Sequence, residues 1–203
     1  MVSGRPVDFL VGALRIGDGR SPLDAYGLYG AEHVAADGSV TRRQPSARWR
    51  AVLELVAGEL RAELASGVEV ETKQVSTVLH WRGAPGTEPL AVHAALGAAV
   101  RHGLELRMGK MSAELLAPGA ADKGDVVREL ADGARATCFL GDDIGDVPAF
   151  VALAELARSG RGRTWRLAVG GPEAPHALVC RADATLDGPA AACAFLAALA
   201  DRI

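Results

Sequence analysis

The stretch that decides the fold is Ala136-Thr137-Cys138-Phe139-Leu140 followed by Gly141-Asp142-Asp143-Ile144-Gly145-Asp146. A short apolar run that ends in glycine is typical of a buried parallel strand opening into a loop. In open α/β sheets, ligands bind at the carboxyl ends of the strands. Three neighbouring carboxylates repel one another unless a cation lies among them, and an all-oxygen ligand set favours a hard ion such as Mg2+. The alternative interpretation is a solvated acidic turn that caps the helix beginning near Val147.

Downstream of Pro118-Gly119, helical and strand patterns alternate around this stretch. The expected elements are a helix over Lys123–Leu130, a strand over Ala136–Leu140, a helix over Val147–Arg158, strands over Trp165–Val169 and Ala184–Leu186, and a helix over Pro189–Asp201. Alternating elements predict a parallel sheet covered by helices. Cys138 in the central strand and Cys193 on the last helix are therefore expected to be small core residues.

The region before Pro118 has a different pattern. The first elements expected are a helix over Asp8–Leu14, a strand over Ala25–Tyr29 and a hairpin over His33–Thr41. Helices over Ser46–Ala65 and Pro89–His102 then alternate with strands over Val68–Lys73, Ser76–Arg82, Leu104–Met108 and Ser112–Leu116. The order β-α-β-β-α-β-β predicts a compact, largely antiparallel domain. We assign residues 1–31 and 118–203 to a parallel core and residues 32–117 to an inserted α/β domain.

Composition excludes several classes of protein. With 203 residues, 49% of them hydrophobic, the chain can bury a sizeable core. A net charge of −3 without a dominant basic face argues against nucleic-acid binding. No apolar stretch is long enough for a membrane helix, and the N-terminus lacks a signal-peptide pattern, so we expect a cytoplasmic protein without membrane contact. The cysteines and histidines show no zinc-ligand spacing.

Two short segments could bind phosphate. Ser3-Gly4-Arg5 offers a hydroxyl and backbone N–H groups after what resembles the end of a strand. An ordinary serine–glycine turn is the alternative and the favoured interpretation when the segment is taken alone. Asp122-Lys123-Gly124 opens a helix, where Lys123 could neutralise a phosphoryl oxygen or a neighbouring carboxylate. A solvated Lys123 beside an Asp122 N-cap is about as plausible.

Polar side chains also follow neighbouring strands of the inserted domain. Glu71 and Lys73 lie on one expected strand, His80 and Arg82 on the next, and Glu114 on a third. If these residues share a face of the sheet, they supply donors and acceptors for a polyhydroxylated ligand. A solvated sheet face would have a similar composition.

Together these motifs resemble the trehalose-6-phosphate phosphatases of the haloacid dehalogenase superfamily. Val2-Ser3-Gly4-Arg5-Pro6 matches the second superfamily motif. Val70-Glu71-Thr72-Lys73, Ser76 and Leu79-His80-Trp81-Arg82 resemble the cap signature V-E-x-K…S…L-H-[YW]-R, which is the most specific of these motifs. Glu114-Leu115, Pro118 and Asp122-Lys123-Gly124 resemble E-L-x-P…D-K-G, which carries the third motif. Gly141–Asp146 resembles the fourth motif, G-D-D-x-T-D-E, with Gly145 and Val147 replacing its Thr and Glu.

The resemblance implies a haloacid-dehalogenase-type doubly wound parallel core with an inserted α+β cap that recognises the substrate. It also implies phosphoryl transfer from trehalose 6-phosphate through an aspartyl-phosphate, with Mg2+ as the cofactor. Ser3 and Arg5 would hold the phosphate, Lys123 would stabilise the transferring group, and Asp142 would ligate the metal with Asp143 and Asp146 orienting it or its waters. The cap residues would grip the sugar; they are Glu71, Lys73, His80, Arg82 and Glu114. We expect a monomer.

One motif of the family is missing. The 203 residues contain no D-x-D-G-T segment, which carries the nucleophile, the general acid and the first strand of the core. We therefore expect a sheet with a gap or an exposed edge, and a chain that is inactive as it stands because its N-terminal segment has been lost. Two alternatives remain open: a non-catalytic sugar-phosphate binding or regulatory protein, and a related phosphatase for another sugar phosphate.

Overall fold

The structure is a computed structural model that describes residues 1–17, 22–64, 67–171 and 174–202. It divides the chain into two compact units, Met1–Ala120 and Ala121–Ile203. The expected helix and strand types are found in both units, with ends that differ by a few residues. Ala65, the last residue of one expected helix, lies outside the described residues.

The first unit begins with a small sheet and one helix. Helix α1 (Val7–Leu14) precedes strands β1 (Ala25–Gly27), β2 (Glu32–Val34) and β3 (Val40–Arg42), which pair antiparallel in the order β1-β2-β3. The expected hairpin is therefore confirmed. A core packs α1 against β1 and β2; its buried members are Val7, Leu10, Ile16, Ala25 and Val34. Because β1 pairs with β2, this sheet extends across residue 31, and the division of the chain into core and inserted cap stays a prediction.

The strand expected over Ala25–Tyr29 is shorter than its apolar pattern indicates. It ends at Gly27, and Leu28–Gly30 forms a 3-10 turn, η1. Leu28 and Tyr29 have φ values of 46° and 59°, which lie in the left-handed region. A residue in that conformation cannot continue a strand, so the expectation is wrong for these two positions.

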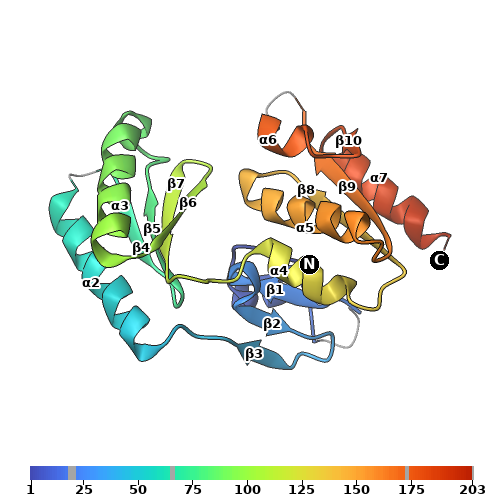
Figure 1. Ribbon diagram of the computed structural model, residues 1–203, viewed down its shortest axis with the longest axis horizontal. Coiled ribbons are helices and arrows are strands. Elements are labelled where there is room, and N and C mark those ends of the chain that lie inside the picture. Colours follow the sequence, from blue (N-terminus) through green and yellow to red (C-terminus); the bar gives the residue numbers. More distant parts are fainter. Residues whose placement is uncertain (18–21, 65–66, 172–173, 203) are drawn as a thin grey trace. The chain divides into compact units, whose positions relative to one another are not determined.

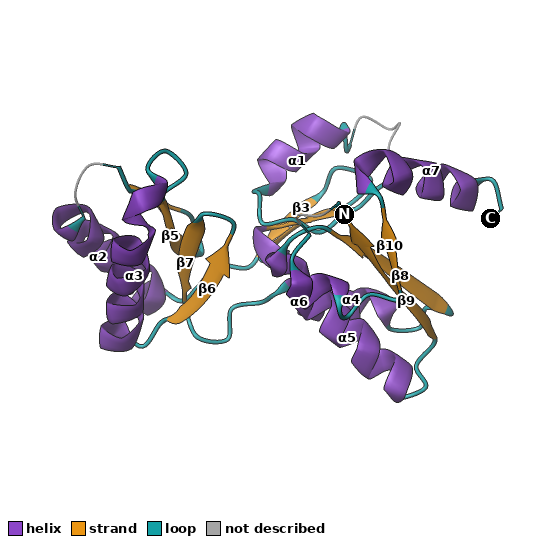
Figure 2. Ribbon diagram, turned by 90° about the horizontal axis from the view of Figure 1, so that it is seen from above, coloured by secondary structure: helices purple, strands orange, loops and turns teal. Residues whose placement is uncertain are grey.

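The rest of the first unit is a four-stranded antiparallel sheet with two helices on one face (Figures 1 and 2). Helix α2 (Ala47–Glu63) precedes β4 (Glu69–Thr72) and β5 (Ser76–His80). A 3-10 turn, η2 (Pro85–Thr87), and helix α3 (Glu88–His102) lead to β6 (Glu105–Gly109) and β7 (Ser112–Leu116). The strand order β4-β5-β7-β6 confirms the predicted antiparallel arrangement.

Sequence periodicity explains how the helices cover this sheet. Helix α2 buries Leu53, Val56 and Leu60 at spacings of three and four residues, which place them on one helical face. Helix α3 buries only alanines, and small side chains let a helix approach its neighbours closely. In the strands, Leu79 and Leu115 point into the same core. The residues that alternate with them in each strand, most of which are polar, therefore point to the opposite face of the sheet.

The second unit is a three-stranded parallel sheet with helices. Helix α4 (Lys123–Ala131) leads to β8 (Ala136–Gly141), the turn η3 (Ile144–Asp146) and helix α5 (Val147–Arg158). Strand β9 (Arg163–Val169), helix α6 (His176–Val179), strand β10 (Ala184–Leu186) and helix α7 (Gly188–Ala200) follow. The strand order is β10-β9-β8, all parallel, as predicted. Figure 2 shows α4 and α5 on one side of this sheet and α7 on the other.

Cys138 and Cys193 are exposed, so the prediction that they are core residues is wrong. Phe139 packs toward α5, where its ring meets Phe150 edge-on at 6.3 Å between centroids. Cys138 therefore points to the other face, beside its β9 partner Trp165, which is 45% exposed. Strand β8 forms one edge of the described sheet, and α7 buries none of its side chains. An apolar run does not reveal which of its two faces is covered.

The architecture is a mixed α/β fold with one parallel sheet and two antiparallel sheets among the described residues, in line with the predicted parallel and antiparallel regions. Among the described residues, none of the helices combines the length and the apolar character needed to cross a bilayer.

One ion pair fixes β9 to the segment that precedes β10. The Arg166 side chain donates from Nε to Asp183 Oδ2 at 3.0 Å and from Nη2 to Oδ1, and the Arg166 backbone N–H donates to the same carboxylate. The hydrogen bonds from the Arg166 side chain hold the pKa of Asp183 below its usual value. The carboxylate contributes stability above its unfolded-state pKa of about 4, and this contribution is lost as the pH falls through the lower folded-state pKa.

Replacing Asp183 by asparagine is therefore expected to lower the free energy of unfolding at pH 7. The loss should be only about 1 kcal/mol, because both side chains of the ion pair are partly exposed to solvent. The difference from the unsubstituted protein should shrink as the pH falls below about 5, because the carboxylate is then increasingly protonated. Urea unfolding at several pH values measures both quantities. Asp201→Asn is the control, since Asp201 has no ion pair in the described part of the chain. If the difference in the free energy of unfolding between Asp183→Asn and the unsubstituted protein does not change with pH, the lowered pKa of Asp183 is contradicted.

Candidate active site

The Ser3-Gly4-Arg5 segment forms a tight turn in the first unit. The Ser3 hydroxyl oxygen accepts a hydrogen bond from the Arg5 backbone N–H at 3.1 Å, so the turn predicted as the ordinary alternative is present. A hydroxyl that accepts through oxygen keeps its proton available for another acceptor. The Arg5 guanidinium lies over the Phe9 ring, 4.4 Å from its centroid, and is exposed. The geometry is thus compatible with both a turn and an anion-binding loop.

Strand β1 and the turn after it hold this segment in place. Ser3 N–H donates to Tyr26 O at 2.8 Å, and Tyr29 N–H donates to Ser3 O at 2.9 Å. At the far end of the segment, the Val7 N–H at the start of α1 donates to the buried carboxylate of Glu32 at 2.8 Å. Glu32 also accepts from Arg42, which neutralises its charge. The backbone around Ser3 is therefore fixed by hydrogen bonds from both sides.

The predicted sugar-binding residues of β4, β5 and β7 share one face of the four-stranded sheet. Strand pairing sets Glu71, Val78, Glu114 and Arg107 in one row across the sheet. Successive side chains alternate between faces, so the residues two positions away in each strand lie on this face as well. We call this face the polar cap face; its polar members are Glu69, Glu71, Lys73, Ser76, His80, Glu105, Arg107, Ser112 and Glu114.

Ion pairs link the members of the polar cap face. His80 Nε2 lies 2.8 Å from Glu71 Oε2, and both side chains are between a third and a half exposed. Lys73 Nζ lies 3.7 Å from Glu114 Oε1, and these two side chains are 16% and 8% exposed. The Ser76 hydroxyl donates to the same Glu114 oxygen at 2.5 Å. One pair is thus open to solvent and the other is set deeper.

Arg82 follows the end of β5 and joins the same region. A pocket of about 280 Å³ is lined by Gly67, Val68, Glu69, His80, Arg82 and Gly83. It brings two predicted site residues, His80 and Arg82, together with Glu69. Glu69, Ser76 and Arg107 were not predicted as site residues, although Ser76 belongs to the quoted cap signature. The antiparallel register is the signal that groups Arg107 with Glu114.

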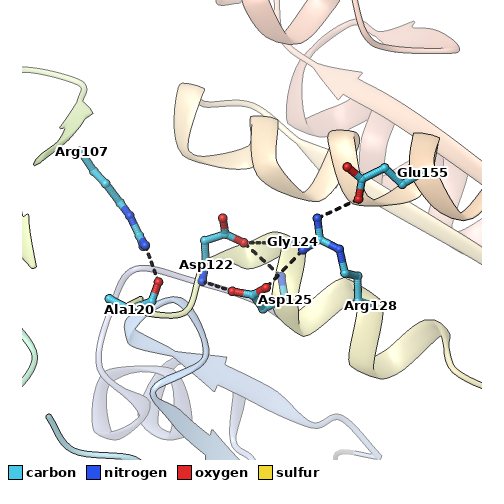
Figure 3. Close-up of polar contacts among 7 residues, drawn as sticks. All are labelled: Arg107, Ala120, Asp122, Gly124, Asp125, Arg128 and Glu155. Atoms are coloured by element: carbon cyan, nitrogen blue, oxygen red, sulfur yellow. Dashed lines mark hydrogen bonds and ion pairs between the residues drawn. The ribbon is translucent and has the colours of Figure 1, made fainter. Parts of the chain in front are cut away.

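In the second unit, Lys123 is paired with a loop acid. Its Nζ lies 2.5 Å from Asp146 Oδ1, with side-chain exposures of 12% and 5%. The solvated lysine that the sequence left open is therefore absent, although Asp122 does cap α4. Asp122 Oδ1 accepts from the N–H groups of Gly124 and Asp125 at 2.7 and 3.0 Å (Figure 3).

Asp146 organises the loop after β8 as well as binding Lys123. Its Oδ2 accepts from the backbone N–H groups of Asp142 and Asp143 at 2.9 and 3.1 Å. A Cβ added at Gly141 would lie 2.6 Å from Asp146 Cβ, which explains why glycine precedes the acids. Asp143 caps the η3 turn by accepting from the Ile144 N–H at 2.5 Å. The acidic turn therefore caps η3, but Asp146 is buried rather than solvated.

The three loop carboxylates do not converge on one point. Within the described residues, no group of three or more His, Cys, Asp or Glu side chains could hold a metal ion. Asp142 is exposed, and its carboxylate has no hydrogen bond or ion pair with any described residue. Mg2+ commonly takes one or two protein carboxylates and completes its shell with water and phosphate. A single free carboxylate at a strand end fits that ion, with Asp146 as the group that shapes the loop.

No protein-family model matches the chain. Two curated trehalose-phosphate phosphatases, from Mycolicibacterium paratuberculosis and Mycobacterium avium, are 35% and 34% identical to it over 187 residues. The alignments cover 87% of this chain and 46% of each relative. The chain therefore spans about half the length of the curated relatives it matches.

Solved structures share the fold over nearly the whole chain. The C. albicans trehalose-6-phosphate phosphatase C-terminal domain has a TM-score of 0.78 at 19% identity, covering 100% of this chain and 78% of that one. A trehalose-6-phosphate phosphatase related protein has a TM-score of 0.69 at 22% identity, covering 100% and 81%. A haloacid dehalogenase-like hydrolase from Bacteroides thetaiotaomicron has a TM-score of 0.61 at 12% identity, covering 91% and 80%. The chain thus has a haloacid dehalogenase-like fold, which confirms the predicted fold class of a parallel core with an α+β cap. Its sequence is similar to those of trehalose-phosphate phosphatases, as its motifs indicate.

Proposed function

We propose that this chain binds trehalose 6-phosphate and carries the phosphate-, metal- and sugar-binding parts of a cytoplasmic, Mg2+-dependent phosphatase for that ester. The observation that carries the proposal is the Lys123–Asp146 pair beside the exposed carboxylate of Asp142 at the carboxyl end of β8. The similarity to curated trehalose-phosphate phosphatases over 87% of the chain supports the choice of substrate.

The polar cap face supplies the recognition of the sugar. A disaccharide presents many hydroxyl groups, each of which donates and accepts hydrogen bonds. The Glu71–His80 and Lys73–Glu114 pairs offer both functions on one sheet face, and Arg82 adds a cation at its edge. Charged partners make stronger hydrogen bonds than neutral ones, which favours a hydroxyl-rich ligand over an apolar one.

The phosphate end of the ligand requires donors and positive charge. Ser3 would donate its free hydroxyl proton to a phosphoryl oxygen, and the exposed Arg5 would add charge. Lys123 would stabilise the negative charge of the phosphoryl group, held in place by Asp146. Asp142 would hold Mg2+, which when bound would offset the charge on the phosphoryl oxygens, with Asp143 and Asp146 shaping the loop.

The hydrolytic step proceeds through an aspartyl-phosphate in this proposal. One Asp would attack phosphorus and a second Asp, two residues later, would protonate the leaving sugar oxygen. These 203 residues contain no Asp-x-Asp pair. We therefore propose that they bind the ester without turning it over, and that hydrolysis requires such a pair to act together with them. We expect the chain to be a monomer.

Binding and turnover of the 203-residue chain separate the possible outcomes. Isothermal titration calorimetry with trehalose 6-phosphate, with and without MgCl2, should give binding that strengthens with magnesium and weakens in Asp142→Asn. A phosphate-release assay on the same sample should give no product. Binding of glucose 6-phosphate with equal affinity would favour a phosphatase for another sugar phosphate. Release of phosphate would overturn the claim of inactivity, and a lack of binding would overturn the function.

A further inference from the structure

Two consecutive residues with side chains adopt the left-handed conformation directly beside the Ser3-Gly4-Arg5 segment. Leu28 has a φ of 46° and Tyr29 has φ 59° and ψ 23°. Residues other than glycine, asparagine and aspartate rarely adopt this region because Cβ crowds the backbone. Such conformations persist where the surroundings over-determine them, and they cluster at ligand-binding sites.

Two backbone hydrogen bonds tie this strained turn to the Ser3 segment. Leu28 N–H donates to Arg5 O at 3.0 Å, and Tyr29 N–H donates to Ser3 O at 2.9 Å. The two left-handed residues therefore each bind one end of the segment. A Cβ added at Gly27, the residue before the turn, would lie 2.7 Å from Val7 N and 2.8 Å from Arg5 O. The two backbones are in such close approach that glycine is required there.

The Tyr29 side chain fills the space next to Gly4. A Cβ added at Gly4 would lie 2.7 Å from both Cζ and Oη of Tyr29. The tip of the ring thus lies against the bare backbone between Ser3 and Arg5. The Ser3 hydroxyl, which accepts from the Arg5 N–H across the same residue, depends on the conformation of Gly4. The left-handed backbone of Tyr29 is what aims the ring at this point.

We propose that Tyr29 is a positioning residue for an oxyanion-binding loop formed by Ser3, Gly4 and Arg5. Its ring fixes the Gly4 backbone, so that the Ser3 hydroxyl and the neighbouring N–H groups keep one orientation toward a phosphate group. The strain of the left-handed turn is retained because it places the ring. This inference rests on the proposed function, since it takes phosphate as the ligand of the loop.

The proposal separates the effect of the ring from that of the backbone strain. Tyr29→Gly removes the ring and relaxes the backbone, so the melting temperature should hold or rise while binding weakens. Tyr29→Asn tolerates the same backbone and serves as the second variant if the glycine variant fails to fold. Tyr29→Phe keeps the ring and should restore binding. Arg15→Gly is the matched control, because Arg15 is exposed, also left-handed with φ 53°, and distant in sequence from the loop.

The test is a titration of the 203-residue chain with inorganic phosphate, followed by the amide signals of Gly4 and Arg5 in 1H–15N NMR spectra. We expect the Kd to rise about tenfold or more in Tyr29→Gly and Tyr29→Asn, and to change less than about threefold in Tyr29→Phe and Arg15→Gly. A ring-current shift of the Gly4 Hα signals, lost in Tyr29→Gly, reports the contact without any ligand.

Each contrary outcome has a distinct meaning. Unchanged phosphate binding in Tyr29→Gly overturns the positioning role and leaves the proposed function intact. Equal losses in Tyr29→Phe and Tyr29→Gly overturn it as well, because the hydroxyl and not the ring would then act. A ring-current shift in the unsubstituted protein without any response of the loop to phosphate overturns the proposed function of Ser3, and this inference with it.

Discussion

Lys123→Met is expected to lower the free energy of unfolding by about 3 kcal/mol at pH 7, because it leaves the buried carboxylate of Asp146 without its cation. Asp146 is 5% exposed, and after the substitution it keeps only the N–H donors of Asp142 and Asp143. Methionine retains most of the length and the apolar stem of lysine, so the lost packing is small. Urea unfolding followed by circular dichroism and by tryptophan fluorescence measures the change.

Arg128→Met is the matched control in the same unit. Arg128 donates to Asp125 and Glu155 at 3.2 and 2.9 Å, but all three side chains are about half exposed (Figure 3). Surface pairs of this kind contribute about 0–1 kcal/mol. Equal losses in the two variants would contradict the view that burial gives the Lys123–Asp146 pair its importance. If Lys123→Met lowers the free energy of unfolding by less than about 0.5 kcal/mol, the Lys123–Asp146 ion pair does not stabilise the protein.

This pair shows how far the sequence can go in predicting the site. An apolar strand ending in glycine predicted the loop at the end of β8. For the lysine that opens the preceding helix, the sequence left two interpretations open: a contact with a phosphoryl oxygen or a neighbouring carboxylate, and a solvated side chain. In the structure, the Lys123 ammonium contacts the carboxylate of Asp146. What the sequence could not show is that Asp146 turns inward onto backbone N–H groups while Asp142 is exposed. That distinction depends on the path of the loop rather than on the order of its acids.

The failures of prediction have a common physical origin in long-range contacts. Period-two alternation correctly grouped Glu71 with Lys73, but Arg107 joins them only through a strand register that links β6 to β7. Tyr29 lies in an apolar run typical of a strand, yet hydrogen bonds to residues more than 20 positions earlier impose its left-handed conformation. Cys138 is exposed because it lies on the face of β8 opposite Phe139, where its β9 partner Trp165 is also exposed. Local pattern carries no information on these partners.

A substitution on the polar cap face is expected to have a large effect on the affinity for the sugar phosphate. Glu114→Gln is expected to weaken binding of trehalose 6-phosphate about tenfold or more while leaving the affinity for inorganic phosphate unchanged. Glu114 Oε1 accepts from the Ser76 hydroxyl and faces Lys73 Nζ at 3.7 Å. Glutamine has the same shape and can still accept from Ser76, but it loses the negative charge that orients Lys73. Hydrogen bonds to a charged acceptor contribute roughly 1.5–3 kcal/mol, which corresponds to about a tenfold to hundredfold change in Kd.

Two ligands and one control variant make this prediction specific to the sugar. Calorimetric titration of Glu114→Gln with trehalose 6-phosphate and with inorganic phosphate compares the two ends of the ligand in one protein. Glu88→Gln is the control, since Glu88 begins α3 on the opposite side of the sheet and should leave both affinities unchanged. Parallel losses for both ligands would point to a folding defect instead of lost sugar contacts. An unchanged affinity for trehalose 6-phosphate would show that the charge of Glu114 has no part in binding the sugar.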